Sequence, residues 1–178
     1  TVLLAGCASQ NTYMGHKVVD MPFTVAGGKT VSLPITDAGP IPAENQSFKI
    51  EVAGFTVGPS KDNPSQAMLT WRFGLTAKSS QTLERVVVEE VAPAAVEKLL
   101  VEDHAPALKD KVWSGSSQPI EASKTSTPWL YTDKASIYVF RFTIKARGEP
   151  DAVFYQPAWF SKPAKEKFRE MIAKINGS

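Results

Sequence analysis

The sequence has a single cysteine, Cys7, and two histidines, His16 and His104. One cysteine excludes a disulfide within the chain, so burial of apolar side chains must stabilise the fold. A zinc site of the common kinds would need carboxylates for most of its ligands, and we expect no metal or other cofactor. The sequence also has no apolar run long enough to cross a bilayer as a helix.

The chain carries little net charge, because 20 basic residues stand against 18 acidic ones for a balance of +2. This balance gives no general electrostatic argument for nucleic acid as a partner. Hydrophobic residues make up 43% and charged residues 21% of the 178 residues, which is typical of a globular domain with an ordinary core. We therefore expect one folded domain.

The motif with the clearest functional meaning stands near the start of the chain. Leu4-Ala5-Gly6-Cys7 resembles the lipobox of bacterial lipoproteins, in which a peptidase cleaves before a cysteine that carries diacylglycerol. The resemblance implies that residues 1–6 are a signal-peptide remnant, that Cys7 is lipidated, and that residues 7–17 form a tether. By the same resemblance, Ala8 and Ser9 in place of an aspartate after the cysteine imply the outer membrane, so we expect a periplasmic domain anchored to the inner leaflet of the outer membrane of a Gram-negative bacterium.

Strict alternation of apolar residues identifies the central strands. Residues 67–77 and 137–147 each place an apolar row on one face, and the second row includes Tyr138, Phe140 and Phe142. Residues 83–91 are predicted as a further strand. We expect it to pair antiparallel with 67–77, because the turn at 78–81 is too short for a crossover connection.

Two other strand patterns contain irregularities. Residues 19–25 and 31–35 alternate about Gly27-Gly28 and predict a hairpin in which Val25 faces Val31 and Pro22 faces Pro34. Within 48–57 the inward face slips by one residue at Ala53-Gly54, which indicates a β-bulge.

The remaining segments are less regular. Residues 92–112 fit either a strand or a helical turn. Residues 113–127 are rich in Ser, Thr, Gly and Pro and are predicted as loop, and 152–156 are predicted as a returning strand.

The chain ends in a predicted helix over 162–175. Ser161 is a suitable N-cap, and Pro163 falls in the first turn. Apolar residues form one stripe at helical spacing: Ala164, Phe168, Met171, Ile172 and Ile175. The helix lysines, Lys165 among them, are expected on the solvated face. Together these elements predict a mainly β fold, an antiparallel β-sandwich of Ig-like or similar type with a C-terminal amphipathic α-helix, over 18–178.

Two groups of side chains are candidates for contact with a partner. The aromatic group lies outside the clear strand patterns, in residues that are common anchors at interfaces: Trp129, Tyr131, Trp159 and Phe160. The basic group forms an outward row on one strand: Arg141, Lys145 and Arg147. Packing at the rim of the sandwich and an ordinary solvated face are the alternative explanations.

The sequence contains no recognisable catalytic motif. His104 follows two carboxylates, but neighbouring residues of an extended chain point to opposite faces. We therefore expect a non-enzymatic binding or adaptor lipoprotein that holds a protein partner or an envelope component, as a secretion or assembly accessory or a toxin-immunity protein does. The alternative is a small cell-envelope hydrolase that uses His104 and spatially clustered carboxylates.

Overall fold

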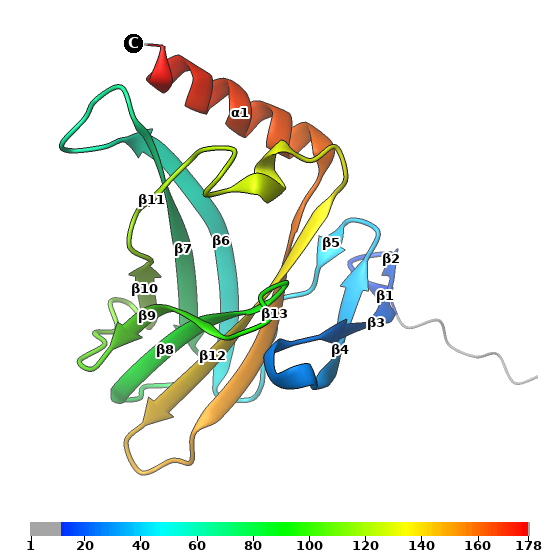
Figure 1. Ribbon diagram of the computed structural model, residues 1–178. Coiled ribbons are helices and arrows are strands. Elements are labelled where there is room, and N and C mark those ends of the chain that lie inside the picture. Colours follow the sequence, from blue (N-terminus) through cyan, green and yellow to red (C-terminus); the bar gives the residue numbers. More distant parts are fainter. Residues whose placement is uncertain (1–11, 178) are drawn as a thin grey trace, which may run out of the picture.

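The computed structural model describes residues 12–177, so Cys7 and the motif around it lie outside the described residues. Two antiparallel sheets face each other across one hydrophobic core, and helix α1 (Lys162–Asn176) lies across one end (Figure 1). One sheet contains β6 (Phe48–Pro59), β7 (Ala67–Ala77), β10 (Val112–Ser116) and β11 (Ile120–Glu121). The other contains, in spatial order, β13 (Ala152–Phe160), β12 (Ser136–Ala146), β8 (Leu83–Ala92) and β9 (Lys98–Asp103). The predicted mainly β sandwich with a C-terminal helix is confirmed.

The alternating strands form the core as predicted. Every second residue of β7 from Ala67 to Ala77 is buried, and the inward row of β12 packs against it. Trp71 lies 5.0 Å from Phe140 between ring centroids, and Phe73 lies 5.8 Å from Phe142. β6 pairs with β7 through a register shift between Val52 and Gly54, so the predicted bulge is confirmed.

The predicted pairing of 83–91 with 67–77 is wrong. β8 pairs with β12 and β9, whereas β7 pairs with β6, β10 and β11, so the two strands lie in opposite sheets. The connection at 78–82 is too short for a crossover within one sheet, but it is long enough to pass between two facing sheets about 10 Å apart.

The prediction of loop over 113–127 is also wrong in part. Residues 112–116 form β10 and residues 120–121 form β11, both paired with β7. Trp113 is buried in the core, and the small polar residues beside it occupy the outward side of a short strand. Within 92–112 the structure resolves the open choice in favour of a strand, β9.

A third sheet covers part of the outer face of the sandwich and consists of β3 (Val19–Thr24), β4 (Thr30–Thr36) and β5 (Gly39–Pro40). The predicted hairpin is present, but its register differs by two residues. Phe23 pairs with Val31, and Pro22 pairs with Ser32, because the turn η1 (Ala26–Gly28) leaves Val25 outside the ladder. Val25 and Leu33 instead pack on Val139, and this small cluster attaches the third sheet to the sandwich.

Part of the expected tether has regular structure. β1 (Thr12–Tyr13) and β2 (His16–Lys17) form a short hairpin beside the third sheet (Figure 1). No helix within residues 12–177 combines the length and apolar composition that crossing a membrane requires.

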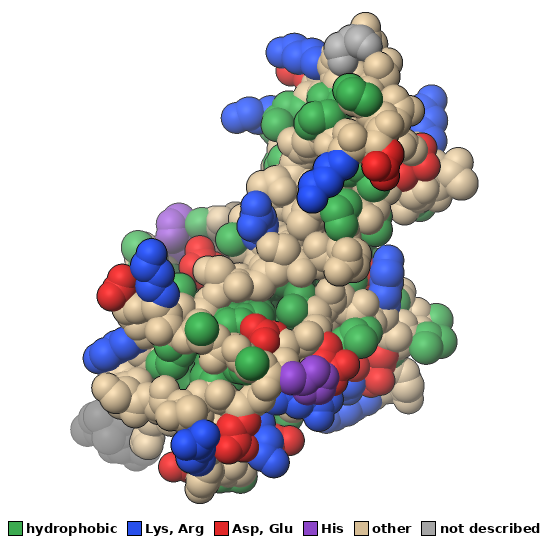
Figure 2. All heavy atoms as spheres, turned by 90° about the vertical axis from the view of Figure 1, so that its left-hand side faces the viewer, with side chains coloured by type: hydrophobic (Ala, Val, Ile, Leu, Met, Phe, Trp, Pro, Cys, Tyr) green, Lys and Arg blue, Asp and Glu red, His purple; other side chains and the backbone are tan. Residues whose placement is uncertain are grey.

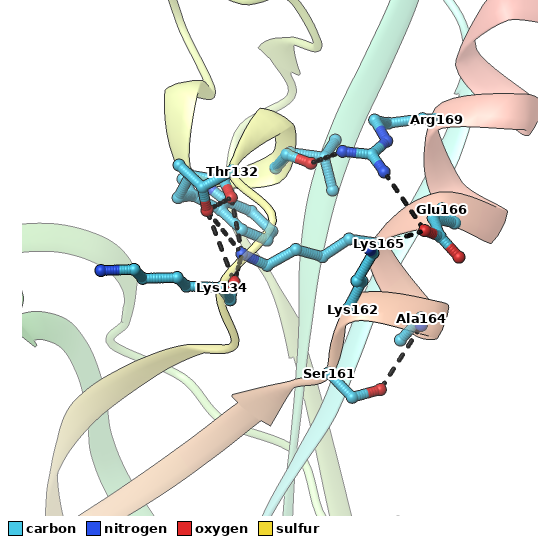
Figure 3. A network of polar contacts seen from close by, with 10 residues as sticks. Thr132, Lys134, Ser161, Lys162, Ala164, Lys165, Glu166 and Arg169 are labelled. Carbon is cyan, nitrogen blue, oxygen red and sulfur yellow. Dashed lines mark hydrogen bonds and ion pairs between the residues drawn. The ribbon is translucent and has the colours of Figure 1, made fainter.

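α1 begins as predicted, with the Ser161 hydroxyl accepting a hydrogen bond from the Ala164 amide at 3.4 Å (Figure 3). Ile172 is buried, whereas Met171 is exposed and does not belong to the packed stripe. At the other end of the helix, the Asn176 side chain accepts a hydrogen bond from the Ala67 amide at 2.8 Å. The helix thus covers the aromatic end of the core, and the molecule narrows between this end and the larger body of the sandwich (Figure 2).

Candidate functional site

A groove runs between β6 and β13, the strands at one side of the two main sheets. It has a volume of about 350 Å³ and is lined by Pro40, Pro42, Ile50, Glu51, Val52, Ala53, Gly54, Gln156, Pro157, Ala158, Trp159 and Phe160. Glu51 is the one ionisable side chain among these residues. Three prolines and a tryptophan give the groove a rigid, largely apolar lining.

Gln156 fixes one wall of the groove. Its side-chain oxygen accepts a hydrogen bond from the Ala43 amide at 2.5 Å, and its nitrogen donates to the Ile41 carbonyl at 3.2 Å. These bonds hold the segment after β5 against β13, and Pro40 and Pro42 are therefore kept in place. Gln156 is itself buried, so its polar atoms bond within the protein and are not available to a group bound in the groove.

The other wall is the bulged part of β6. Gly54 has φ 93°, a conformation that a side chain would strain, and the bulge residues Val52, Ala53 and Gly54 all line the groove. The Ala43 carbonyl accepts from the Ile50 amide at 2.8 Å. Past Ile50, no backbone hydrogen bond from residues 12–177 outside its own sheet reaches β6. The outer edge of this stretch therefore has no backbone partner.

The structure separates the four aromatic candidates. Trp159 lies on the outward face of β13, with 39% of its surface exposed at the groove. Phe160 is buried and Trp129 is half-buried, and their rings meet at 5.1 Å in the core. Tyr131 is half-buried in the turn η2 (Pro128–Tyr131), where burial raises the pKa of its hydroxyl. Trp159 is therefore the one of the four that is exposed.

The three basic candidates do not form a free positive row. Arg141 donates to Glu89 at 2.7 Å and to Glu97 at 2.7 Å on the outer face of the β8–β12 pair. Burial alone would lower the pKa of the Arg141 guanidinium, but its bonds to the two carboxylates raise it overall. Arg147 contacts Glu84 at 3.5 Å, and Lys145 is exposed.

Charges of both signs are also mixed on the face that carries β9 and β10 (Figure 2). His104 lies at the end of β9, largely exposed, with Nε2 at 3.4 Å from Glu102. His16 makes a separate pair with Asp37 at 2.8 Å. Within residues 12–177, no three His, Cys, Asp or Glu side chains come together in a way that could hold a metal ion. Neither histidine lines the β6–β13 groove.

Sequence reasoning missed the most buried charge in the described chain. Lys165 is fully buried, and its ammonium nitrogen lies within hydrogen-bond distance of four oxygen atoms, which its three N–H groups share. Three of them, the Trp129 carbonyl, the Thr132 hydroxyl and the Lys134 carbonyl, are seen in Figure 3, and the fourth is the Ser136 hydroxyl at 2.7 Å. Burial lowers the pKa of this group, and the charge of Arg169 adds to the effect. The prediction of a solvated Lys165 is thus wrong. The spacing along the helix could have indicated this burial, because Lys165 stands three residues before Phe168 and seven before Ile172, on the same helix face.

The buried ammonium group of Lys165 has a structural role. It binds α1 to η2 and to the start of β12, and it keeps the helix over the aromatic core. Arg169 supports the same contact by donating to the Leu130 carbonyl at 3.4 Å.

No family model, no curated protein and no solved structure matches this chain.

Proposed function

We propose that this chain is a lipid-anchored periplasmic binding domain, tethered through Cys7, that holds a protein partner at the β6–β13 groove. The observation that carries the proposal is the exposed indole of Trp159 at a proline-lined groove between two sheet edges. Tryptophan is enriched among the few residues that dominate binding energy at protein interfaces. The resemblance of Leu4–Cys7 to a lipobox supports the location.

The lining of the groove favours an extended peptide segment as the bound group. A single ionisable side chain and an internally bonded glutamine offer few polar contacts to a charged small molecule. The open edge of β6 past Ile50 offers backbone groups with which an added strand can pair. The indole and the prolines beside that edge then contact alternate side chains of the added strand.

The partner site is tested by placing a photo-crosslinking amino acid at position 159 or 153 of the full-length protein in the envelope. Val153 is the matched control, because it lies on the outward face of the same strand and is 52% exposed. We expect a discrete adduct of higher mass from position 159 and none from 153. We also expect Trp159→Ala to weaken capture of that same adduct protein about tenfold. Equal adducts at both positions, or none at 159, would contradict the proposal.

The anchor is tested separately by intact-mass analysis of the protein extracted from membranes. We expect a chain that begins at Cys7 and carries the added mass of diacylglycerol. Cys7→Ser should release most of the protein from membranes and leave its unfolding midpoint unchanged. An unmodified thiol still joined to Gly6 would rule the anchor out.

A further inference from the structure

We propose that the β1–β2 hairpin and the start of β3 make a second, direct contact with the lipid surface beside the anchor. This inference rests on the proposed lipidation of Cys7. It concerns three exposed apolar side chains, Tyr13, Met14 and Val19, which we call the hairpin patch. Within residues 12–177 nine large hydrophobic residues are exposed, and three of them fall in this stretch of seven residues.

The backbone presents the tip of the hairpin to the outside. Tyr13 pairs with His16, and Met14 and Gly15 form the turn with φ of 52° and 84°. A positive φ is unfavourable for a side chain such as that of methionine, and Asn or Gly is the usual residue there. Met14 is nevertheless 84% exposed, so neither turn geometry nor packing within the chain explains an apolar residue at this position.

Contacts with the third sheet hold the hairpin patch together. The pair between His16 and Asp37 joins the hairpin to the turn after β4 at 2.8 Å. Beside it lies a shallow hollow of about 370 Å³, whose lining includes Tyr13, Met14 and Thr36. Val19 pairs with Ile35, the residue before Thr36, so all three side chains of the patch lie at the same end of the third sheet.

The length of chain to the anchor identifies the occupant as lipid. Thr12 is five residues after Cys7, and five residues span at most about 18 Å even when fully extended. With its acyl chains in the bilayer, Cys7 therefore keeps the hairpin close to the headgroups. Tyrosine is enriched at that depth, and the neighbouring Lys17 has a long stem that can reach the headgroups.

The contact also determines how the partner site is presented. Pro40 lines both the hollow beside the hairpin patch and the β6–β13 groove. An orientation with the patch on the bilayer therefore holds the groove near the membrane surface. Helix α1 and strands β9 and β10 lie on other sides of the molecule (Figure 1).

The inference is tested with the lipidated full chain on vesicles of phosphatidylethanolamine and phosphatidylglycerol. A nitroxide is attached at Met14→Cys or, as the matched control, at Val96→Cys, since Val96 is 78% exposed on the loop before β9. We expect the label at 14 to be reached by oxygen from the bilayer and shielded from a water-soluble nickel complex, with the reverse at 96. Equal accessibility at both positions would overturn the inference even where mass analysis shows the lipid on Cys7.

A second measurement separates this inference from the proposed anchor. The Cys7→Ser chain, which has no lipid anchor, should sediment weakly with the same vesicles. In this chain, Met14→Asp should reduce the bound fraction about fivefold, whereas Val96→Asp should leave it unchanged. Equal loss in both variants, or no effect of Met14→Asp, would overturn the hairpin contact. An unmodified Cys7 in the native protein would instead overturn the anchor.

Discussion

The indole nitrogen of Trp113 donates a hydrogen bond to the Asp103 carboxylate at 2.9 Å, and this bond joins β10 of one sheet to β9 of the other. Asp103 also accepts from the Ala105 amide at 3.0 Å, so the carboxylate is held in position by its own chain. The Trp113–Asp103 bond therefore links the two sheets on the side of the sandwich opposite the β6–β13 groove. The two sides therefore differ: a partly buried hydrogen bond joins the two sheets on one side, and the edge of β6 past Ile50 has no backbone partner on the other.

Removing the carboxylate should weaken this link. Asp103→Ala leaves the buried Trp113 N–H without its acceptor, and we expect the free energy of unfolding to fall by about 1–3 kcal/mol. Urea unfolding followed by circular dichroism measures the change. Asp151→Ala, in the exposed β12–β13 turn, is the control and should change stability little. Equal stability of the two variants would show that the bond contributes nothing.

The same tryptophan explains why glycine stands at position 115. A Cβ built at Gly115 would lie 2.4 Å from Cη2 of Trp113, whereas at Gly58, also in a strand, it would meet nothing within 4 Å. Gly115→Ala should therefore lower the free energy of unfolding by about 1–3 kcal/mol through displacement of the indole. Gly58→Ala should be close to neutral. Comparable urea midpoints for the two alanine variants would contradict this account.

The parts of the fold that the sequence predicted are those set by local periodicity. The alternation in 67–77, the slip at Ala53-Gly54 and the cap at Ser161 each depend on neighbouring residues, and each is confirmed. The partner of a strand is not encoded in its own alternation. The alternation in β7 and β8 therefore fits two arrangements equally well: pairing within one sheet, and facing each other across the core from two sheets.

The candidate site was predicted only in part, for a related reason. Trp159 was a candidate by residue type, and the structure places it at the groove. One wall of the groove is held by hydrogen bonds between Gln156 and the segment 41–43, which are more than a hundred residues apart, and no local pattern joins them. Likewise, the acceptors of Lys165 come from the η2 turn and the start of β12, so its burial is a tertiary property.

Lys165 should be essential for stability although it is charged. Lys165→Met keeps the approximate length of the side chain but removes the three N–H donors that bind the surrounding oxygen atoms, and we expect a loss of about 2–4 kcal/mol in the free energy of unfolding. Lys167→Met, on the exposed side of the same helix, is the matched control and should change stability by less than about 0.5 kcal/mol. The comparison is made by urea unfolding. A stable Lys165→Met variant would mean that apolar packing alone holds the helix.

Glu90 provides a pH-dependent test of the core. It lies opposite Phe140 on the inward side of β8, beside Lys98 of β9. Burial raises the pKa of the Glu90 carboxyl above its ordinary value of 4.5, and the charge of Lys98 offsets part of this shift. Burial and the charge of Glu90 in turn raise the pKa of Tyr138.

A raised carboxyl pKa means that the folded state holds the proton more tightly than the unfolded state does. The stability that this preference contributes is fully present below pH 4.5 and is lost as the pH rises through the higher folded value. Glu90→Gln removes the ionisation, so it should raise the urea midpoint relative to the natural chain at pH 7 and lose that advantage near pH 4. Glu149→Gln, in the exposed β12–β13 turn, is the control and should leave the urea midpoint at pH 7 unchanged. A Glu90→Gln variant less stable than the natural chain at pH 7 would mean that the attraction to Lys98 outweighs the cost of burial.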